Sequence, residues 1–148
     1  MAGDYKYWVH GVAVQVEFPS EVTSIQRAGW GTEIVQAQGT ENWFHFAIPT
    51  PTRLDKEDVD QQELYLLAHI DNKATIDEMS CHRAGEEARL EEWNVSYSAR
   101  TIDASTPFII PKQKCTKPLV LCIHVKFDGP GDGMITFHGA GGSFEEHT

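Results

Sequence analysis

The sequence predicts an all-β fold, an antiparallel β-sandwich resembling a jelly roll with about nine strands. Apolar residues alternate with other residues at period two in several segments, as they do in strands with one buried face. Glycine, proline and acidic residues separate these segments in the manner of turns. No segment has helical spacing over the length that a connection between parallel strands requires. A closed barrel is the alternative architecture, because it would produce the same pattern.

Two clearly alternating strands are expected before residue 50. In residues 8–18 the even positions form an apolar row that consists of Val12, Val14, Val16 and Phe18. His10 falls on the same row, so a hydrogen-bonded core histidine is expected there. In residues 42–49 the inward positions are Phe44, Phe46 and Ile48. Gly29 and Gly31 bracket Trp30, which predicts either a bulge with a core tryptophan or a bend that presents the indole to a pocket.

Later segments repeat the alternation. Residues 63–71 place Leu64, Leu66, Ala68 and Ile70 inward, and leave Tyr65, Leu67 and His69 outward. Residues 118–127 have the longest row, formed by Leu119, Leu121, Ile123, Val125 and Phe127, and residues 133–140 add Ile135 and Phe137. Weaker strands are expected at residues 24–32, 75–82, 89–93 and 106–110. Residues 49–62 and 83–89 concentrate proline or charge and are expected to be loops.

Composition limits the classes of partner. The 148 residues fit one domain, residues 1–148, and the net charge of −10 disfavours nucleic acid, whose recognition needs clustered Lys and Arg. No apolar run approaches the roughly 20 residues that span a bilayer. Three cysteines without paired spacing, and a start without the pattern of a secretory signal, indicate a soluble, acidic, cytoplasmic protein with reduced thiols.

The last apolar segments predict a hairpin around the turn "DGPGDG". If Phe127 pairs with Ile135, His124 faces His138 on the outer surface of the sheet. Cys122, His124 and His138 could then hold zinc, but CxxC and HExxH spacings are missing, so no metal and no cofactor is predicted. The alternative is a pair of half-exposed surface histidines. The glycines of residues 139–143 are expected in a flexible strand end.

Aromatic and histidine side chains occupy several outward positions. The predicted ligand-binding residues are Trp43, His45, Tyr65, His69 and Trp30, which combine flat apolar area with hydrogen-bonding groups. They suit a small polar or oxygenated organic ligand, such as a sugar or a ring compound. Coverage of these rows by a second layer or by another copy in a homo-oligomer is the alternative, because the sequence does not show which strands share a sheet.

The predicted function is therefore binding of such a ligand. The alternative function is a small cofactor-independent isomerase, cyclase or hydrolase, in which His124 and His138 would transfer protons. Asp71, Asp77, Glu78 and Asp103 could assist, but none has a spacing that selects it.

The segments "WVHG", "GWGT" and "NWFHFAIPTP" resemble an uncharacterised family of small β-sandwich proteins found mainly in bacteria. The matching residues cover about the first third of the chain: Trp8, His10, Gly11, Gly29, Trp30, Gly31, Asn42, Trp43, Phe44, His45, Pro49 and Pro51. The resemblance implies the sandwich fold and carries no activity with it.

Overall fold

A computed structural model describes residues 4–147 as strands joined by turns and two short 3-10 helices. One group of strands comprises β1 (Asp4–His10), β3 (Val22–Ala28), β4 (Gly31–Gln36), β6 (Arg53–Leu54), β7 (Glu57–Ile70), β10 (Arg100–Ile102), β11 (Phe108–Lys114) and β13 (Gly133–Glu146). The other comprises β2 (Gln15–Val16), β5 (Thr40–Ile48), β8 (Thr75–Arg83), β9 (Glu91–Tyr97) and β12 (Leu119–Phe127). The 3-10 helices are η1 (Gly11–Ala13) and η2 (Pro19–Glu21).

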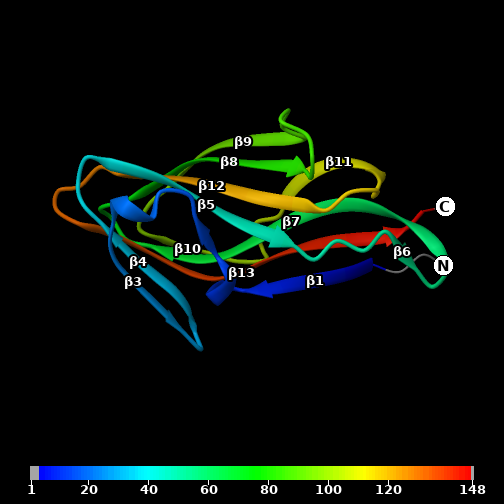
Figure 1. Cartoon of the computed structure of the whole chain (residues 1–148), viewed down its shortest axis with the longest axis horizontal. Coiled ribbons are helices and arrows are strands. Elements are labelled where there is room, and N and C mark those ends of the chain that lie inside the picture. The colour runs from blue at the N-terminus through cyan, green and yellow to red at the C-terminus, as the bar shows by residue number, and fades with distance from the viewer. Residues whose placement is uncertain (1–3, 148) are drawn as a thin grey trace.

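The strands form two antiparallel sheets that pack face to face (Figure 1). Sheet A has the order β10-β7-β13-β4-β3; β1 also pairs with β13, and β11 and β6 also pair with β7. Sheet B has the order β2-β5-β12-β8-β9. Both sheets have open edges, so the predicted β-sandwich is confirmed and the barrel alternative is wrong. Within residues 4–147 no helix is long and apolar enough to cross a membrane.

The predicted inward rows fill the space between the sheets. All the residues predicted to face inward from β5, β7, β12 and β13 are at most 3% exposed. Phe137 of sheet A contacts Phe44 and Phe46 of sheet B, with ring centroids 5.0 and 5.7 Å apart. Aromatic side chains remove the most apolar area from water, so these contacts between the layers stabilise the sandwich strongly.

Residues 8–18 do not form one strand. The chain leaves sheet A after His10, passes through η1 and enters sheet B at β2. Val14 is buried, but Val12 and Phe18 are 42% and 48% exposed. The predicted core position of His10 is wrong, since its exposed ring donates from Nε2 to the Gly29 carbonyl and accepts at Nδ1 from the Val12 amide. Val12, Val14, Val16 and Phe18 therefore do not form one buried row.

A close approach of backbones explains the bend. A Cβ atom on Gly11 would lie 2.0 Å from the Phe137 carbonyl oxygen, and a Cβ on Gly31 would lie 2.1 Å from the same atom. Gly31 also has a φ of +140°, which side chains disfavour. Gly29 and Trp30 form the turn between β3 and β4, where the indole is 45% exposed. The expected core tryptophan is therefore wrong. The chain does bend here, and the position of the indole in a pocket stays a prediction.

The predicted hairpin of residues 122–138 is wrong. β12 pairs with β5 and β8 in sheet B, whereas β13 pairs with β1, β4 and β7 in sheet A. The segment between them crosses from one sheet to the other. Phe127 therefore does not pair with Ile135, and His124 does not face His138. The hypothetical zinc set of Cys122, His124 and His138 is divided between the sheets.

Two segments that were predicted to be irregular contain strands. The glycines of residues 139–143 lie inside β13, between β1 and β7. They let the strands and Trp8 approach closely, since a Cβ on Gly141 would lie 2.6 Å from the Trp8 ring and from the Tyr7 carbonyl oxygen. Likewise, β7 begins at Glu57 within the predicted loop of residues 49–62. The predicted loop at residues 83–89 is confirmed apart from Arg83, which ends β8, because residues 84–90 join β8 to β9.

Candidate functional site

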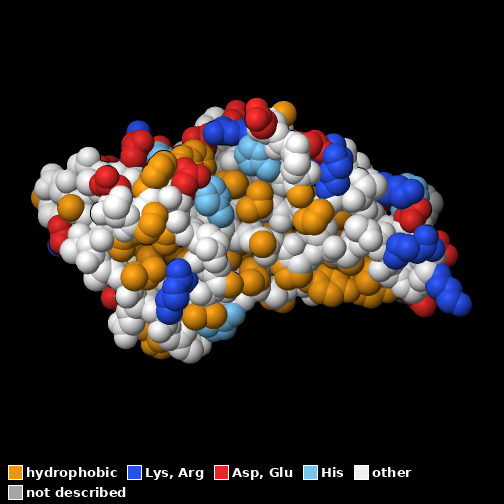
Figure 2. Space-filling model, viewed as in Figure 1, with side chains coloured by type: hydrophobic (Ala, Val, Ile, Leu, Met, Phe, Trp, Pro, Cys, Tyr) orange, Lys and Arg blue, Asp and Glu red, His pale blue; other side chains and the backbone are white. Residues whose placement is uncertain are grey.

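Sheet B presents a row of functional side chains on its outer surface. We name this surface the Trp43 face and define it by Trp43 and His45 of β5, Cys122 and His124 of β12, and Ser80 and His82 of β8. The strand register places His124 between Trp43 and Glu78, and Cys122 between His45 and Ser80. Figure 2 shows histidine and apolar side chains together over the region of these three strands.

Trp43 is the aromatic centre of this face. Its half-buried ring is parallel to His45, at 6.4 Å and 6° between planes, and tilted against His124 at 4.7 Å. The guanidinium carbon of Arg89 lies 5.9 Å from the centroid of the Trp43 ring. Arg89 in turn binds Glu78 and Glu92. One ring on the same strand and one on the neighbouring strand β12 therefore hold the indole in a fixed orientation, with a cation over it.

His124 is held by a carboxylate that sequence reasoning did not select. The His124 Nδ1–H donates to Asp77 Oδ1 at 2.6 Å, and Nε2 lies 3.6 Å from Glu41 Oε1. The residue is only 7% exposed. Asp77 Oδ2 lies 3.5 Å from Lys126 Nζ. The bond to Asp77 fixes the ring and leaves Nε2 directed towards Glu41, an arrangement suited to accepting a hydrogen bond or transferring a proton.

A cavity of 140 Å³ opens on the other side of Trp43. It is lined by Glu17, Trp43, His45, Ser80, His82, Arg89 and Cys122. His45 donates from Nε2 to Glu17 at 2.9 Å. Burial raises the pKa of the Cys122 thiol, and a hydrogen bond with Ser80 partly opposes this shift. The thiol is therefore protonated near neutral pH, so the cavity offers hydrogen-bonding groups rather than an activated nucleophile.

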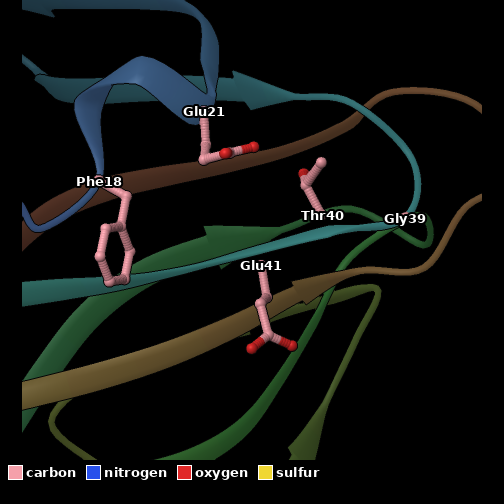
Figure 3. Close-up of a pocket in the computed structure, with 5 residues that line it drawn as sticks. All are labelled: Phe18, Glu21, Gly39, Thr40 and Glu41. Atoms are coloured by element: carbon pink, nitrogen blue, oxygen red, sulfur yellow. The ribbon is translucent and has the colours of Figure 1, made fainter.

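A larger cavity, of 400 Å³, lies at the end of sheet B beside the turn before β5. It is lined by Phe18, Glu21, Gly39, Thr40 and Glu41. Figure 3 shows Phe18 and Glu21 on the η2 side of β5, and the Glu41 carboxylate directed to the side of β12. An adjoining cavity of 180 Å³ includes Glu41 and Lys126. Glu41 therefore belongs both to these end cavities and to the surroundings of His124.

The predicted site residues are divided between two surfaces. Trp43, His45 and His124 lie together on sheet B, whereas Tyr65, His69, His138 and Trp30 belong to sheet A. Tyr65 is 4% exposed because Trp8 covers it at 5.5 Å. His138 donates from Nδ1 to the Trp30 carbonyl at 2.8 Å, and His69 hydrogen bonds with Thr101. The structure does not bring this second group to the Trp43 face.

Several residues on or beside the Trp43 face were not predicted. They are Glu17, Glu41, His82 and Arg89, together with Asp77, which the sequence offers only as one of several carboxylates. The outward position of His82 on the predicted strand of residues 75–82 was the signal that could have found it. That signal required knowing that β8 lies beside β12. Within residues 4–147 no group of three histidine, cysteine or acidic residues has the geometry of a metal site.

Comparison with solved structures finds the same fold at low sequence identity. A chain of the Glycosylation Associate Protein (Gap123) complex from Streptococcus agalactiae matches with a TM-score of 0.58 and 14% identity over 97% of this chain. This chain spans only 26% of that one. Accessory secretory protein 1, 2 and 3 from Streptococcus pneumoniae matches with a TM-score of 0.54 and 11% identity, over 89% of this chain and 96% of that chain.

A third similar structure is a family 29 carbohydrate-binding module from Piromyces equi, with a TM-score of 0.51 and 6% identity. The match covers 96% of this chain and 90% of the module. At such identities these similarities show the β-sandwich fold alone. No curated protein matches the sequence. One family does match, over residues 3–136, and it is described as a family of unknown function, DUF6623. The chain belongs to this DUF6623 family, in agreement with the resemblance to uncharacterised β-sandwich proteins.

Proposed function

We propose that the Trp43 face binds a small sugar-like ligand. The observation that carries the proposal is the half-buried Trp43 ring, flanked by His45 and His124 and bordered by a 140 Å³ cavity. A sugar presents a flat apolar surface that packs on an indole and hydroxyl groups around its rim. The hydrogen-bonding groups around Trp43 match that rim, because imidazole, hydroxyl and carboxylate groups all border the ring.

The fold supports the same class of ligand. The Piromyces equi structure is a carbohydrate-binding module whose fold matches this β-sandwich with a TM-score of 0.51. A β-sandwich of this kind can therefore serve as a scaffold for sugar binding. The binding residues of that module do not carry over to this chain, because proteins of one fold have different sites.

The proposal is tested by titrating a panel of oligosaccharides against ¹⁵N-labelled protein. Trp43→Ala should abolish the shift changes caused by a binding sugar, because truncation removes the stacking surface. Trp30→Ala is the matched control, as Trp30 is 45% exposed on sheet A. If a sugar binds and Trp43→Ala leaves its affinity unchanged, or if Trp30→Ala weakens it equally, the Trp43 face is not the site.

A second candidate function is general acid–base catalysis at His124. The favouring observation is the 2.6 Å hydrogen bond from His124 to Asp77, the arrangement in which a carboxylate orients a catalytic imidazole. His138 has no part in it, because it lies on sheet A. A turnover found with any sugar should be lost in His124→Gln and depend on pH through His124. A rate unchanged in His124→Gln would exclude this candidate.

A further inference from the structure

We propose that the ligand of the Trp43 face carries a free amino group, as in an oligosaccharide of unacetylated amino sugars, and that this group binds between Glu41 and His124. The proposal rests on the proposed function, since it names the class of sugar that the same face would take. Three features of the described residues support it: the separation of His124 Nε2 from the Glu41 carboxylate, the charge of the surroundings, and the space beside Glu41.

Nε2 of His124 and the Glu41 carboxylate face each other at a separation longer than a hydrogen bond. Because Nδ1 of His124 donates to Asp77, Nε2 is the ring atom that faces Glu41, and an Nε2 without a proton presents its lone pair there. Nε2 and Glu41 Oε1 are 3.6 Å apart, and no hydrogen bond joins Nε2 to any residue in the range 4–147. The His124 side chain is only 9% exposed. An ammonium nitrogen at about 2.9 Å from both atoms fits this separation and supplies donors to each.

The charges around the pair favour a cation. Lys126 is paired with Asp77 at 3.5 Å, and Arg89 is bound by Glu78 and Glu92. The basic groups of the face are therefore already neutralised by carboxylates. Glu21, at the end cavity, has no ion pair among residues 4–147. An anionic sugar would be repelled here, whereas an amine would gain from the carboxylates of Glu21 and Glu41, which no Lys or Arg of residues 4–147 pairs.

Trp43 also accommodates positive charge. The Arg89 guanidinium already lies over its ring, because the ring face attracts cations. Glu41 is two residues from Trp43 on β5, so the two side chains emerge on the same face roughly 7 Å apart. Beyond Glu41 the 400 Å³ cavity adds the Phe18 ring and the Thr40 hydroxyl. A sugar ring on Trp43 could therefore extend to a second ring beside Phe18, with an amino group at Glu41.

The experiment compares glucosamine oligomers with their fully N-acetylated counterparts of equal length, by calorimetry at pH 7 with wild type, Glu41→Gln and Glu33→Gln. Glu33 lies on β4 of sheet A, so Glu33→Gln removes the same charge elsewhere. We expect the free-amine oligomer to bind about tenfold more tightly than the acetylated one to wild type. Glu41→Gln should remove this preference, and Glu33→Gln should keep it. Trilysine, a cation without sugar rings, should not compete.

Each contrary result overturns the inference in a recognisable way. Equal binding of both oligomers would exclude an amino-group site but leave sugar binding by Trp43 intact. If Glu41→Gln still prefers the free-amine oligomer, or if trilysine competes with it equally well, the oligomer is attracted by the overall negative charge of the protein and not by a site at Glu41. If neither oligomer binds, the amino-sugar inference fails, and the oligosaccharide panel with Trp43→Ala decides the proposed function separately.

Discussion

Trp43 and His124 lie directly opposite each other on the adjacent strands β5 and β12, with ring centroids 4.7 Å apart. Opposed side chains on one face of an antiparallel pair interact most strongly, and aromatic pairs benefit most. Asp77 on the neighbouring strand holds His124 from the other side. Three adjacent strands thus fix the orientation of one indole.

A double-mutant cycle should detect this coupling. Trp43→Ala and His124→Ala, singly and together, should give a coupling free energy of about 0.5–1.5 kcal/mol in urea unfolding, because each ring loses its partner in either single variant. The control cycle pairs Trp43→Ala with His138→Ala, whose side chain lies on sheet A. That cycle should be additive. A coupling energy no larger than that of the control would contradict the contact.

The contacts between the sheets predict that Phe137→Ala strongly reduces the stability of the protein. Phe137 is fully buried against Phe44 and Phe46, so truncation leaves a cavity and should reduce the free energy of unfolding by about 3–5 kcal/mol. Ile109→Ala removes an apolar side chain that is 59% exposed and should stay within about 0.5 kcal/mol of wild type. Similar unfolding midpoints for the two variants would show that Phe137 is not central to the core.

Gly141 should not tolerate a methyl group. Its Cβ would lie 2.6 Å from the Tyr7 carbonyl oxygen and from the Trp8 ring, so Gly141→Ala must displace β1 or Trp8. We expect a loss of about 1–3 kcal/mol in the free energy of unfolding, with a change in tryptophan fluorescence. Gly29→Ala is the matched control, since a Cβ at Gly29 would have no other atom within 4 Å. Equal stability of the two variants would refute the close packing of β1 on β13.

The cysteines should react slowly while the protein is folded. Burial raises the pKa of the Cys81 thiol to about 12 and that of Cys115 to about 11, so almost no thiolate is present at pH 8. All three thiols are unpaired and buried. Ellman's reagent should therefore detect them fully only after unfolding. Rapid reaction of Cys81 in the native protein would contradict its burial.

Acid should weaken the contact between the loop that follows β8 and the segment that leads into β12, where Glu86 pairs with Lys117. Hydrogen bonds from Lys117 and Arg83 lower the pKa of Glu86 below its usual value of 4.5. A lowered folded-state pKa contributes stability above the unfolded-state pKa, and this contribution is lost as pH falls through the folded value. When the pH is lowered from 6 to 3, the thermal unfolding midpoint of Glu86→Gln should therefore fall less steeply than that of wild type. Identical slopes would show that the ion pairs contribute nothing measurable.

The sequence predicts faces better than it predicts neighbours. Phe44, Leu66 and Ile123 were assigned inward correctly, because burial of one face of a strand imposes a period of two. The same period cannot show which strand pairs with which. His124 and His138 alternate identically whether β12 and β13 form a hairpin or lie in opposite sheets. The short distance along the chain between the two strands favours a hairpin. In the structure, residues 128–132 instead carry the chain from sheet B to sheet A.

The candidate site was predictable to the same extent. Trp43, His45 and His124 were recognised as outward, and they do lie together because β5 and β12 are neighbours. Asp77 could not be selected from the alternation. His124 pairs with Glu78 and Val125 with Ile76, so Asp77 lies at an irregularity in the pairing of β8 with β12, and a regular register does not place it beside His124. Arg89 lies in a loop without alternation, and no periodic pattern would place its guanidinium over Trp43.

Gly11 and Gly31 both approach one atom, the Phe137 carbonyl oxygen. Three separate stretches of backbone therefore meet at a single point: the crossing into sheet B, the start of β4 and the bulged part of β13. A side chain at either glycine would displace the same oxygen, so the two positions are under one shared steric constraint. In an alignment of relatives they should behave as a covarying pair, and a homologue that has lost one glycine should also have reshaped β13 or lost the other.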